Sequence, residues 1–201
     1  MLAHLLQAVG WSSALLLPLF LNTLGASRSE IGLVMSSAAI GGLAARPSVG
    51  SALDRWGRHK TITVGTLAVT LSMAALVTIE SVGWQLIVLR MLFGAGTGAL
   101  FTGYFTLATD LIPASRRTEG IALFGITGLV PLAINPIAES AGVTGVSIPT
   151  FLALMSLTLL ASIAPLWLVR RPPLPIVTKS SQMGLMKLFA SRRLRSAWIG
   201  T

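Results

Sequence analysis

Long apolar stretches, separated by short polar connections, occupy most of the chain. A helix of about 20 apolar residues crosses the ~30 Å hydrocarbon core of a bilayer. Between Gly120 and Val169 only Glu139 is charged. One helix through this segment would be about 75 Å long, so two helices are required, with a break among the glycines and proline of 142–149. The pattern predicts six membrane-spanning helices, at residues 5–24, 31–53, 61–79, 84–109, 120–141 and 146–169.

The amino-acid composition agrees with a membrane protein. Hydrophobic residues make up 53% of the 201 residues and charged residues only 10%, whereas soluble domains carry about 25% charged residues. The segment from Leu2 to Ser27 has no charged residue and is too long for the apolar core of a signal peptide, so we interpret it as the first membrane helix. The short connections favour a compact, all-α bundle. The absence of cysteine excludes disulfides.

The basic residues are concentrated on alternate connections. The connections after the second and fourth predicted helices, together with the carboxyl-terminal tail, hold twelve of the fifteen lysines and arginines, while the opposite connections hold only Arg28. Cytoplasmic connections are enriched in Lys and Arg, so we expect a multi-pass plasma-membrane protein whose amino terminus and tail are cytoplasmic. This distribution argues against nucleic acid as a partner, despite the net charge of +9, and in favour of the lipid bilayer.

The tail, residues 170–201, differs in character from the rest of the chain. Two arginines and two prolines at 170–173 end the sixth predicted helix. Residues 183–198 mix apolar and basic side chains and could lie on the inner membrane surface as an amphipathic helix. The alternative, which we favour, is a basic cytoplasmic linker that leads to a seventh helix beginning near Ser196.

A tight turn connects the second and third predicted helices. Gly57 permits a backbone conformation that other residues resist. Asp54 is an anion at a helix carboxyl terminus, where the helix dipole disfavours it, so we expect it to pair with a cation. The cations within reach are Arg55, Arg58 and Lys60. Small residues recur at every fourth position before Asp54, interrupted by Arg46, so another helix can approach this face closely.

This segment resembles the signature between the second and third helices of major facilitator superfamily transporters, G-x-L-A-D-R-x-G-R-[KR]. The matching residues are Gly50, Asp54, Arg55, Gly57 and Arg58, with Lys60 one place beyond the usual final cation, after His59. Ala52 and Leu53 reverse the usual order. The resemblance implies a conformational-switch loop that latches the cytoplasmic sides of two six-helix halves, with Asp54 and Arg58 in that role.

Weaker resemblances to the same family extend along the chain. Arg90 followed by glycines resembles the family's fourth-helix motif, and the segment from Asp110 to Pro113 resembles its next connection. The first helix is similar to those of drug and sugar efflux members. The G-x-x-x-G-P motif of efflux antiporters is reduced to its proline, since its glycine positions hold Pro131 and Asn135 before Pro136. The resemblance implies the amino-terminal half of a twelve-helix transporter, a six-helix bundle built as a 3+3 inverted repeat.

Polar residues inside the predicted spans are candidate cavity residues. An arginine near the centre of a span costs about 2.5–3.5 kcal/mol on insertion scales, so Arg90 should face the bundle interior, although snorkelling to the outer interface is the alternative. Asn22, Asn135 and Glu139 could line the same cavity, bond across helices or lie at the interface. His4 is expected to be exposed. The residues expected to serve helix packing are Gly94, Gly98, Pro131 and Pro136.

These observations predict secondary active transport of a small solute, coupled to protons and directed outward by alternating access. The substrate site would lie at the midplane between two halves, so this half requires the missing carboxyl-terminal half or a second copy as a partner. The alternative is a truncated, non-transporting membrane protein. The sequence contains no metal cluster, nucleophile triad or phosphate loop, so we expect neither an enzyme nor a cofactor nor a bound metal.

Overall fold

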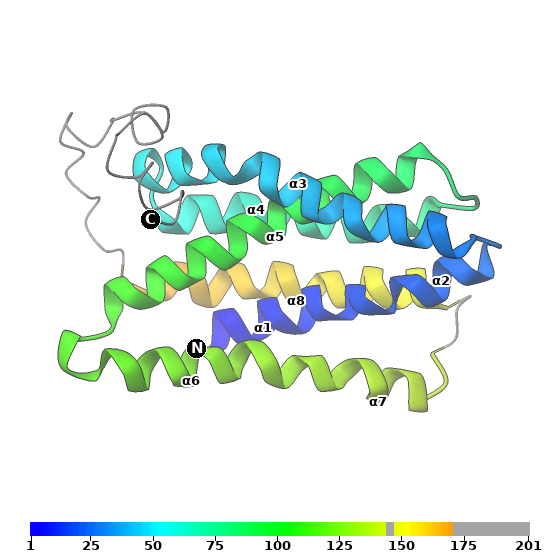
Figure 1. Cartoon of the computed structure of the whole chain (residues 1–201). Helices are drawn as coiled ribbons and strands as arrows, with labels where there is room; N and C mark the ends of the chain where they lie inside the picture. The colour runs from blue at the N-terminus through cyan, green and yellow to red at the C-terminus, as the bar shows by residue number, and fades with distance from the viewer. Residues whose placement is uncertain (144–146, 171–201) are drawn as a thin grey trace, which may run out of the picture.

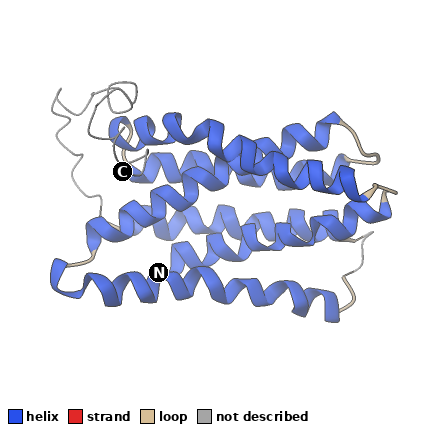
Figure 2. Ribbon diagram, viewed as in Figure 1, coloured by secondary structure: helices blue, strands red, loops and turns tan. Residues whose placement is uncertain are grey.

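The computed structural model describes residues 1–143 and 147–170, and within them every regular element is a helix (Figure 2). The first span is α1 (Leu2–Ser12), a 3₁₀ turn (Ser13–Leu16) and α2 (Leu17–Thr23). Pro18 stands in the first turn of α2. Because proline lacks an N–H and its ring displaces the preceding turn, the tighter 3₁₀ segment falls just before it.

The second and third spans are α3 (Arg28–Arg55) and α4 (Arg58–Ala75), the latter continued by a 3₁₀ turn (Leu76–Thr78). Helix α3 begins three residues before the range predicted from the sequence because Ser27 and Glu30 form a capping box at its amino terminus. The reciprocal bonds satisfy amide groups that the helix itself leaves free.

The fourth span is α5 (Trp84–Leu111), followed by a short 3₁₀ turn (Ala114–Arg116). The fifth is divided into α6 (Arg117–Leu129), a 3₁₀ segment (Val130–Ala133) and α7 (Ile134–Ser140), with Pro131 at the division. The sixth is α8 (Ile148–Leu168). Gly142, at φ +86°, reverses the chain after α7, within the segment where the sequence predicted the break.

The prediction of an all-helical membrane bundle is confirmed. Five of the six helical runs in the described residues are long and apolar enough to cross a membrane. The run outside those five is α3, whose apolar side chains are diluted by glycine, serine, Arg46 and Pro47. A helix of 28 residues is about 42 Å long and spans a bilayer by length, and its small residues serve contacts with a neighbouring helix.

The helices lie side by side with their connections gathered at two ends (Figure 1). One end holds the amino terminus, the α3–α4 turn, the α5–α6 connection and the end of α8. Helix α5 packs against α3 on one side and α4 on another, while α8 packs against α4 and α1. The tail that the sequence assigned to a basic linker lies outside the described residues apart from Arg170.

Backbone-to-backbone contacts hold α5 against its two neighbours. A Cβ atom added at Gly94 would overlap the backbone of Ala38 in α3, and one added at Gly41 would overlap that of Met91. On the α4 side, a Cβ atom at Gly65 would lie 2.9 Å from the carbonyl oxygen of Gly96. Apolar helices gain no hydrophobic energy from pairing in lipid, so van der Waals contact at this range helps to join them, and on the α4 side the Ser72 hydroxyl adds a hydrogen bond to the Leu89 carbonyl at 2.6 Å.

The first and fifth spans differ most in how deeply they are packed. In its most apolar window the first span is 61% buried, and the fifth span, α6 to α7, is only 17% buried. Helix α1 packs along α8, where Gly10 contacts Leu159. The fifth span packs mainly against α1, so most of its surface is left for lipid or for another partner.

Candidate functional site

The turn between α3 and α4 is built on Gly57. Its φ of +83° lies in the left-handed region that an L side chain rarely adopts, and it directly precedes the first residue of α4. The amide of Trp56 closes α3 by donating to the carbonyl of Ala52 at 2.8 Å. The turn therefore fixes the direction in which the cation Arg58 leaves the start of α4.

Arg58 joins α4 to two other helices. Its Nε donates to Oδ2 of Asp110 at 2.8 Å, and its Nη1 donates to the carbonyl of Leu53 at 3.2 Å. The Arg58 side chain is 11% exposed and that of Asp110 29%, so this pair is screened less than a free surface pair. The bonds tie the ends of α3, α4 and α5 together at the end of the bundle that carries the amino terminus.

The expectation that Asp54 pairs with Arg58 or a neighbouring cation is wrong. Asp54 is exposed and has no ion pair within the described part of the chain. Consecutive residues of an α-helix are rotated by about 100° from each other. Arg58 contacts the carbonyl of Leu53, so Asp54, the next residue, points in another direction. Asp110 stands at the carboxyl-terminal end of α5, the same dipole-disfavoured position as Asp54, and this is the signal that could have identified it as the partner.

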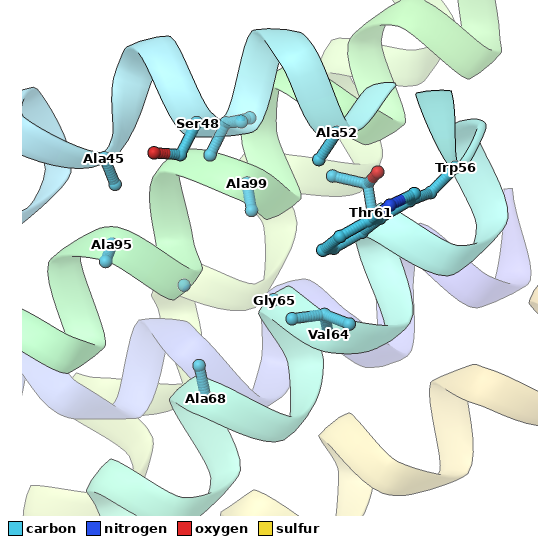
Figure 3. Close-up of a pocket in the computed structure, with 12 residues that line it drawn as sticks. Ala45, Ser48, Ala52, Trp56, Thr61, Val64, Gly65, Ala68, Ala95 and Ala99 are labelled. Carbon is cyan, nitrogen blue, oxygen red and sulfur yellow. The ribbon is translucent and has the colours of Figure 1, made fainter. Parts of the chain in front are cut away.

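The other residues of the predicted switch loop remain on the surface. Gly50, Arg55 and Lys60 are all exposed. An added Cβ at Gly50 would meet no atom within 4 Å, so in this half nothing occupies the space that its lack of a side chain leaves. Trp56, also exposed, extends beside the start of α4 (Figure 3).

Arg90 lies inside the bundle. It is 6% exposed, its guanidinium carbon sits 4.6 Å from the centre of the Phe93 ring, and its Nε is buried without a hydrogen-bond partner among the described residues. Snorkelling to the outer interface does not describe this geometry. All six acidic residues of the chain lie in its described part, and none forms an ion pair with Arg90 there. A buried cation is costly without an anion.

The other predicted cavity residues are scattered. Asn22 and Glu139 are exposed, near the ends of α2 and α7. Asn135 is partly buried and donates from Nδ2 to the carbonyl of Ser12 at 3.1 Å, while its Oδ1 is buried without a partner in the described structure. Ser12 in turn donates to the carbonyl of Pro131 at 3.2 Å. These bonds fasten the fifth span to the first, and Asn135 does not join Asn22 or Glu139 in one described cavity.

His4 makes a second connection between these two spans, and the expectation that it is exposed is wrong. It is 5% exposed, its Nδ1 lies 2.7 Å from the Thr127 hydroxyl, and its ring stacks on Phe124 with centroids 4.0 Å apart. The apolar sequence around position 4 carries no sign of this burial, because the covering residues come from α6, more than 100 positions away.

The predicted packing residues occupy different environments. Gly94 is in tight contact with Ala38, whereas a Cβ at Gly98 would lie 3.7 Å from the nearest atom, the carbonyl oxygen of Gly42. Pro131 is buried in the 3₁₀ segment of the fifth span, and Pro136 is exposed on α7. From their spacing in the sequence, the two glycines were expected to serve the same packing role, and the structure gives the close contact to Gly94.

One cation that the sequence analysis left out of its candidate sites lies in a hollow between α3 and α5. Arg46 is exposed there, and the hollow has a volume of about 480 Å³. Its other lining residues are small or carry an aromatic ring or a hydroxyl: Gly42, Val49, Gly50, Gly98, Phe101 and Thr102. Position 46 is nine residues before the end of α3, about 14 Å along its axis, so this charge lies within the depth of the bilayer.

Comparisons with known proteins agree on one family. The Major Facilitator Superfamily model matches residues 1–200. The multi-drug resistance efflux pump PmrA of Streptococcus pneumoniae is 30% identical over 188 residues, covering 87% of this chain and 44% of the pump. The multidrug resistance protein MdtG of Rahnella sp. is 29% identical over 187 residues, covering 87% of this chain and 43% of that protein. The chain thus spans less than half the length of these curated relatives.

Solved structures share the fold. The inward-open xylose transporter XylE from E. coli superposes with a TM-score of 0.71 at 15% identity, covering 98% of this chain and 53% of XylE. The structure of the proton:xylose symporter XylE bound to 6-bromo-6-deoxy-D-glucose gives a TM-score of 0.70 at 16% identity, covering 86% and 44%. The family model that matches residues 1–200 shows that the chain belongs to the major facilitator superfamily, and the superpositions, together with the α3–α4 hairpin and the six-run bundle, agree that it corresponds to the amino-terminal half of that fold.

Proposed function

We propose that the protein is a secondary active transporter of the plasma membrane, of which this chain forms the amino-terminal six-helix half. The proposed activity is proton-coupled export of a small solute by alternating access, completed by a carboxyl-terminal half or a second copy. The amino terminus and the tail are cytoplasmic in this proposal. The basic residues at one end of the bundle support that orientation.

The observation that carries the proposal is the buried charge of Arg90. Its guanidinium lies in the interior, and no carboxylate of this chain pairs with it in the described structure. Arginine keeps its proton, so it cannot carry the coupling proton. It can bind an anionic solute group, or lower the pKa of a carboxylate supplied by the other half, which then carries the proton.

The hollow at Arg46 supports a solute path along α3 and α5. A lipid-exposed arginine at this depth would be costly, and arginines inside membranes almost always face the bundle interior or a water-filled cavity. A volume of about 480 Å³ is within the usual range of small-molecule sites. In the proposal this hollow faces the other half, and the solute passes between the two.

The α3–α4 hairpin supplies the conformational switch. Because Arg58 is held by Asp110 and Leu53, it makes this end of the half rigid. Asp54 is exposed and unpaired in the described structure, so it is free to contact the other half when the cytoplasmic side closes. Glu139 and Asn22, both exposed near the ends of their spans, are assigned no contact with the solute in this proposal.

Export is favoured by the relatives, since both are described as drug-resistance proteins and PmrA as an efflux pump. The alternative, a non-transporting fragment, is distinguished by testing the full gene product in everted membrane vesicles. With a respiration-driven proton gradient reported by acridine orange, addition of ethidium and then of other small drugs should release protons. Arg90→Ala should abolish this release at unchanged membrane abundance.

The matched control for Arg90 is Arg117, an exposed arginine at the start of α6. Arg117→Ala should release protons as the parent does. A parent protein that inserts normally and moves no solute would support the non-transporting alternative, and normal coupling in Arg90→Ala would remove the central argument for a functional Arg90.

A further inference from the structure

A narrow apolar groove runs along the outside of the bundle between α3 and α4, with α5 as its floor (Figure 3). Its volume is about 200 Å³. The walls and floor carry small residues, among them Ala45 and Ala52 of α3, Ala68 of α4, and Ala99 of α5. Helices α3 and α4 each press closely on α5 but contact each other much less, so the groove is what remains between them.

The groove faces lipid rather than the solute path. Two hollows flank α3 on either side of Val49, which lines both, and the one with an intramembrane charge is the hollow at Arg46. This groove has no charged lining residue. On α4, the exposed residues along the outer face are large and apolar, with Val64, Leu67 and Leu71 each at least half exposed. An exposed apolar band of this kind suits contact with acyl chains.

The length of the groove matches one leaflet. From Ala45 to Trp56 it follows eleven residues of α3, about 16 Å along the helix axis. Half of a ~30 Å hydrocarbon core is about 15 Å. Trp56 lines the end nearest the α3–α4 turn and is 56% exposed, which is the position in which tryptophan marks the headgroup level.

Cations flank the mouth of the groove while the nearby anion is turned away. Arg55 lies three residues after the lining residue Ala52, and Lys60 lies four before the lining residue Val64, so each shares a face with the wall. Both are exposed. Asp54 lies two residues after Ala52, on the opposite side of α3. Arg58 is already bound to Asp110, which leaves Arg55 and Lys60 to meet a phosphate group.

The geometry points to a binding site for an anionic phospholipid of the leaflet next to the α3–α4 turn. One acyl chain lies in the groove, the glycerol region contacts Trp56, and the phosphate lies between Arg55 and Lys60. Positive charges near the membrane surface attract anionic lipid, and the groove adds a fixed place for the chain, so this lipid is held in preference to a zwitterionic one. The site does not depend on transport activity.

The test uses quenching of Trp56 fluorescence by lipids brominated on the acyl chain, with the full-length protein in nanodiscs. The Trp56 signal is obtained as the difference between the parent and Trp56→Phe. Dibrominated phosphatidylglycerol should quench this signal at a several-fold lower mole fraction than dibrominated phosphatidylcholine. Equal quenching by the two lipids would overturn the proposal.

Two pairs of variants separate the chain site from the charge site. Ala52→Leu places a larger side chain in the groove and should reduce quenching by both lipids, whereas Ala44→Leu, at an exposed position outside the groove, should not. The double change Arg55→Gln and Lys60→Gln should remove the preference for phosphatidylglycerol while retaining quenching. The same double change at the exposed residues Arg116 and Arg117 should leave the preference intact.

Each variant is first checked for helical content by circular dichroism, and the charge variants decide the question if Ala52→Leu does not fold. A preference that survives neutralisation of Arg55 and Lys60 would overturn the phosphate assignment. If quenching of Trp56 falls as protein is added at fixed lipid composition, a second copy of the chain fills the groove, and the lipid site is refuted.

Discussion

Two glycines four residues apart on α5 should respond in opposite ways to alanine. An added Cβ at Gly94 overlaps the backbone of Ala38, so the two helices must move apart. Overpacking of this kind costs about 1–3 kcal/mol, and the upper end applies because backbone, not a mobile side chain, is in the way. Alanine favours a helix over glycine by about 1 kcal/mol, which leaves a net loss of about 2 kcal/mol for Gly94→Ala.

The same substitution at Gly98 has room. The nearest atom to its added Cβ would be 3.7 Å away, an ordinary van der Waals contact, so the helix preference of about 1 kcal/mol remains as a gain. The two variants should therefore differ by about 3 kcal/mol in the free energy of unfolding. Titration with SDS in mixed micelles, followed by circular dichroism, measures that difference. Equal stabilities for Gly94→Ala and Gly98→Ala would refute the close α3–α5 contact.

Three further predictions concern the charges. A double-mutant cycle on Arg58→Ala and Asp110→Ala should give a coupling energy of about 1–2 kcal/mol in the same unfolding assay, between the values of exposed and buried pairs; a value near zero would reduce the pair to a surface contact. Asp54→Asn should leave stability unchanged because Asp54 has no ion pair in the described structure, yet slow transport by the full protein, and unchanged transport would remove it from the switch. Arg90→Ala should insert at least as well as the parent in a glycosylation-based insertion assay because a desolvation cost is removed, and poorer insertion would mean that its charge is already satisfied inside the membrane.

The helices could be predicted because their cause is local. A run of apolar residues about 20 long has one stable arrangement in lipid, whatever its neighbours are, so six runs appeared at nearly the predicted positions. The observed helix ends differed from the predicted ones where a specific cap acted, as at Ser27 and Glu30. The division of the fifth span at Pro131 was a further difference. The turn at Gly57 could also be predicted, because its left-handed backbone conformation favours glycine at that position.

The contacts between helices could not be predicted from the sequence in the same way. Asp54 is nearer to Arg58 in the sequence than Asp110 is, yet the position of α5 brings Asp110 to the guanidinium. Gly94 and Gly98 lie four residues apart, on the same side of α5, but α3 approaches α5 closely only at Gly94. These outcomes depend on the relative positions of whole helices, which are set by contacts between residues far apart in the chain.

The packing of the first helix has a consequence for how the protein is inserted into the membrane during synthesis. Helix α1 is synthesised before its main partner α8, which follows about 150 residues later and so takes on the order of 10–30 s to appear at typical elongation rates. During that interval the buried polar residues of α1, including His4, Gln7 and Ser12, lack neighbours that the later spans supply. We expect the translocon or an insertase to hold α1 until the sixth span arrives, and a stalled chain that ends before α8 to present an apolar helix with uncovered polar side chains to membrane quality control.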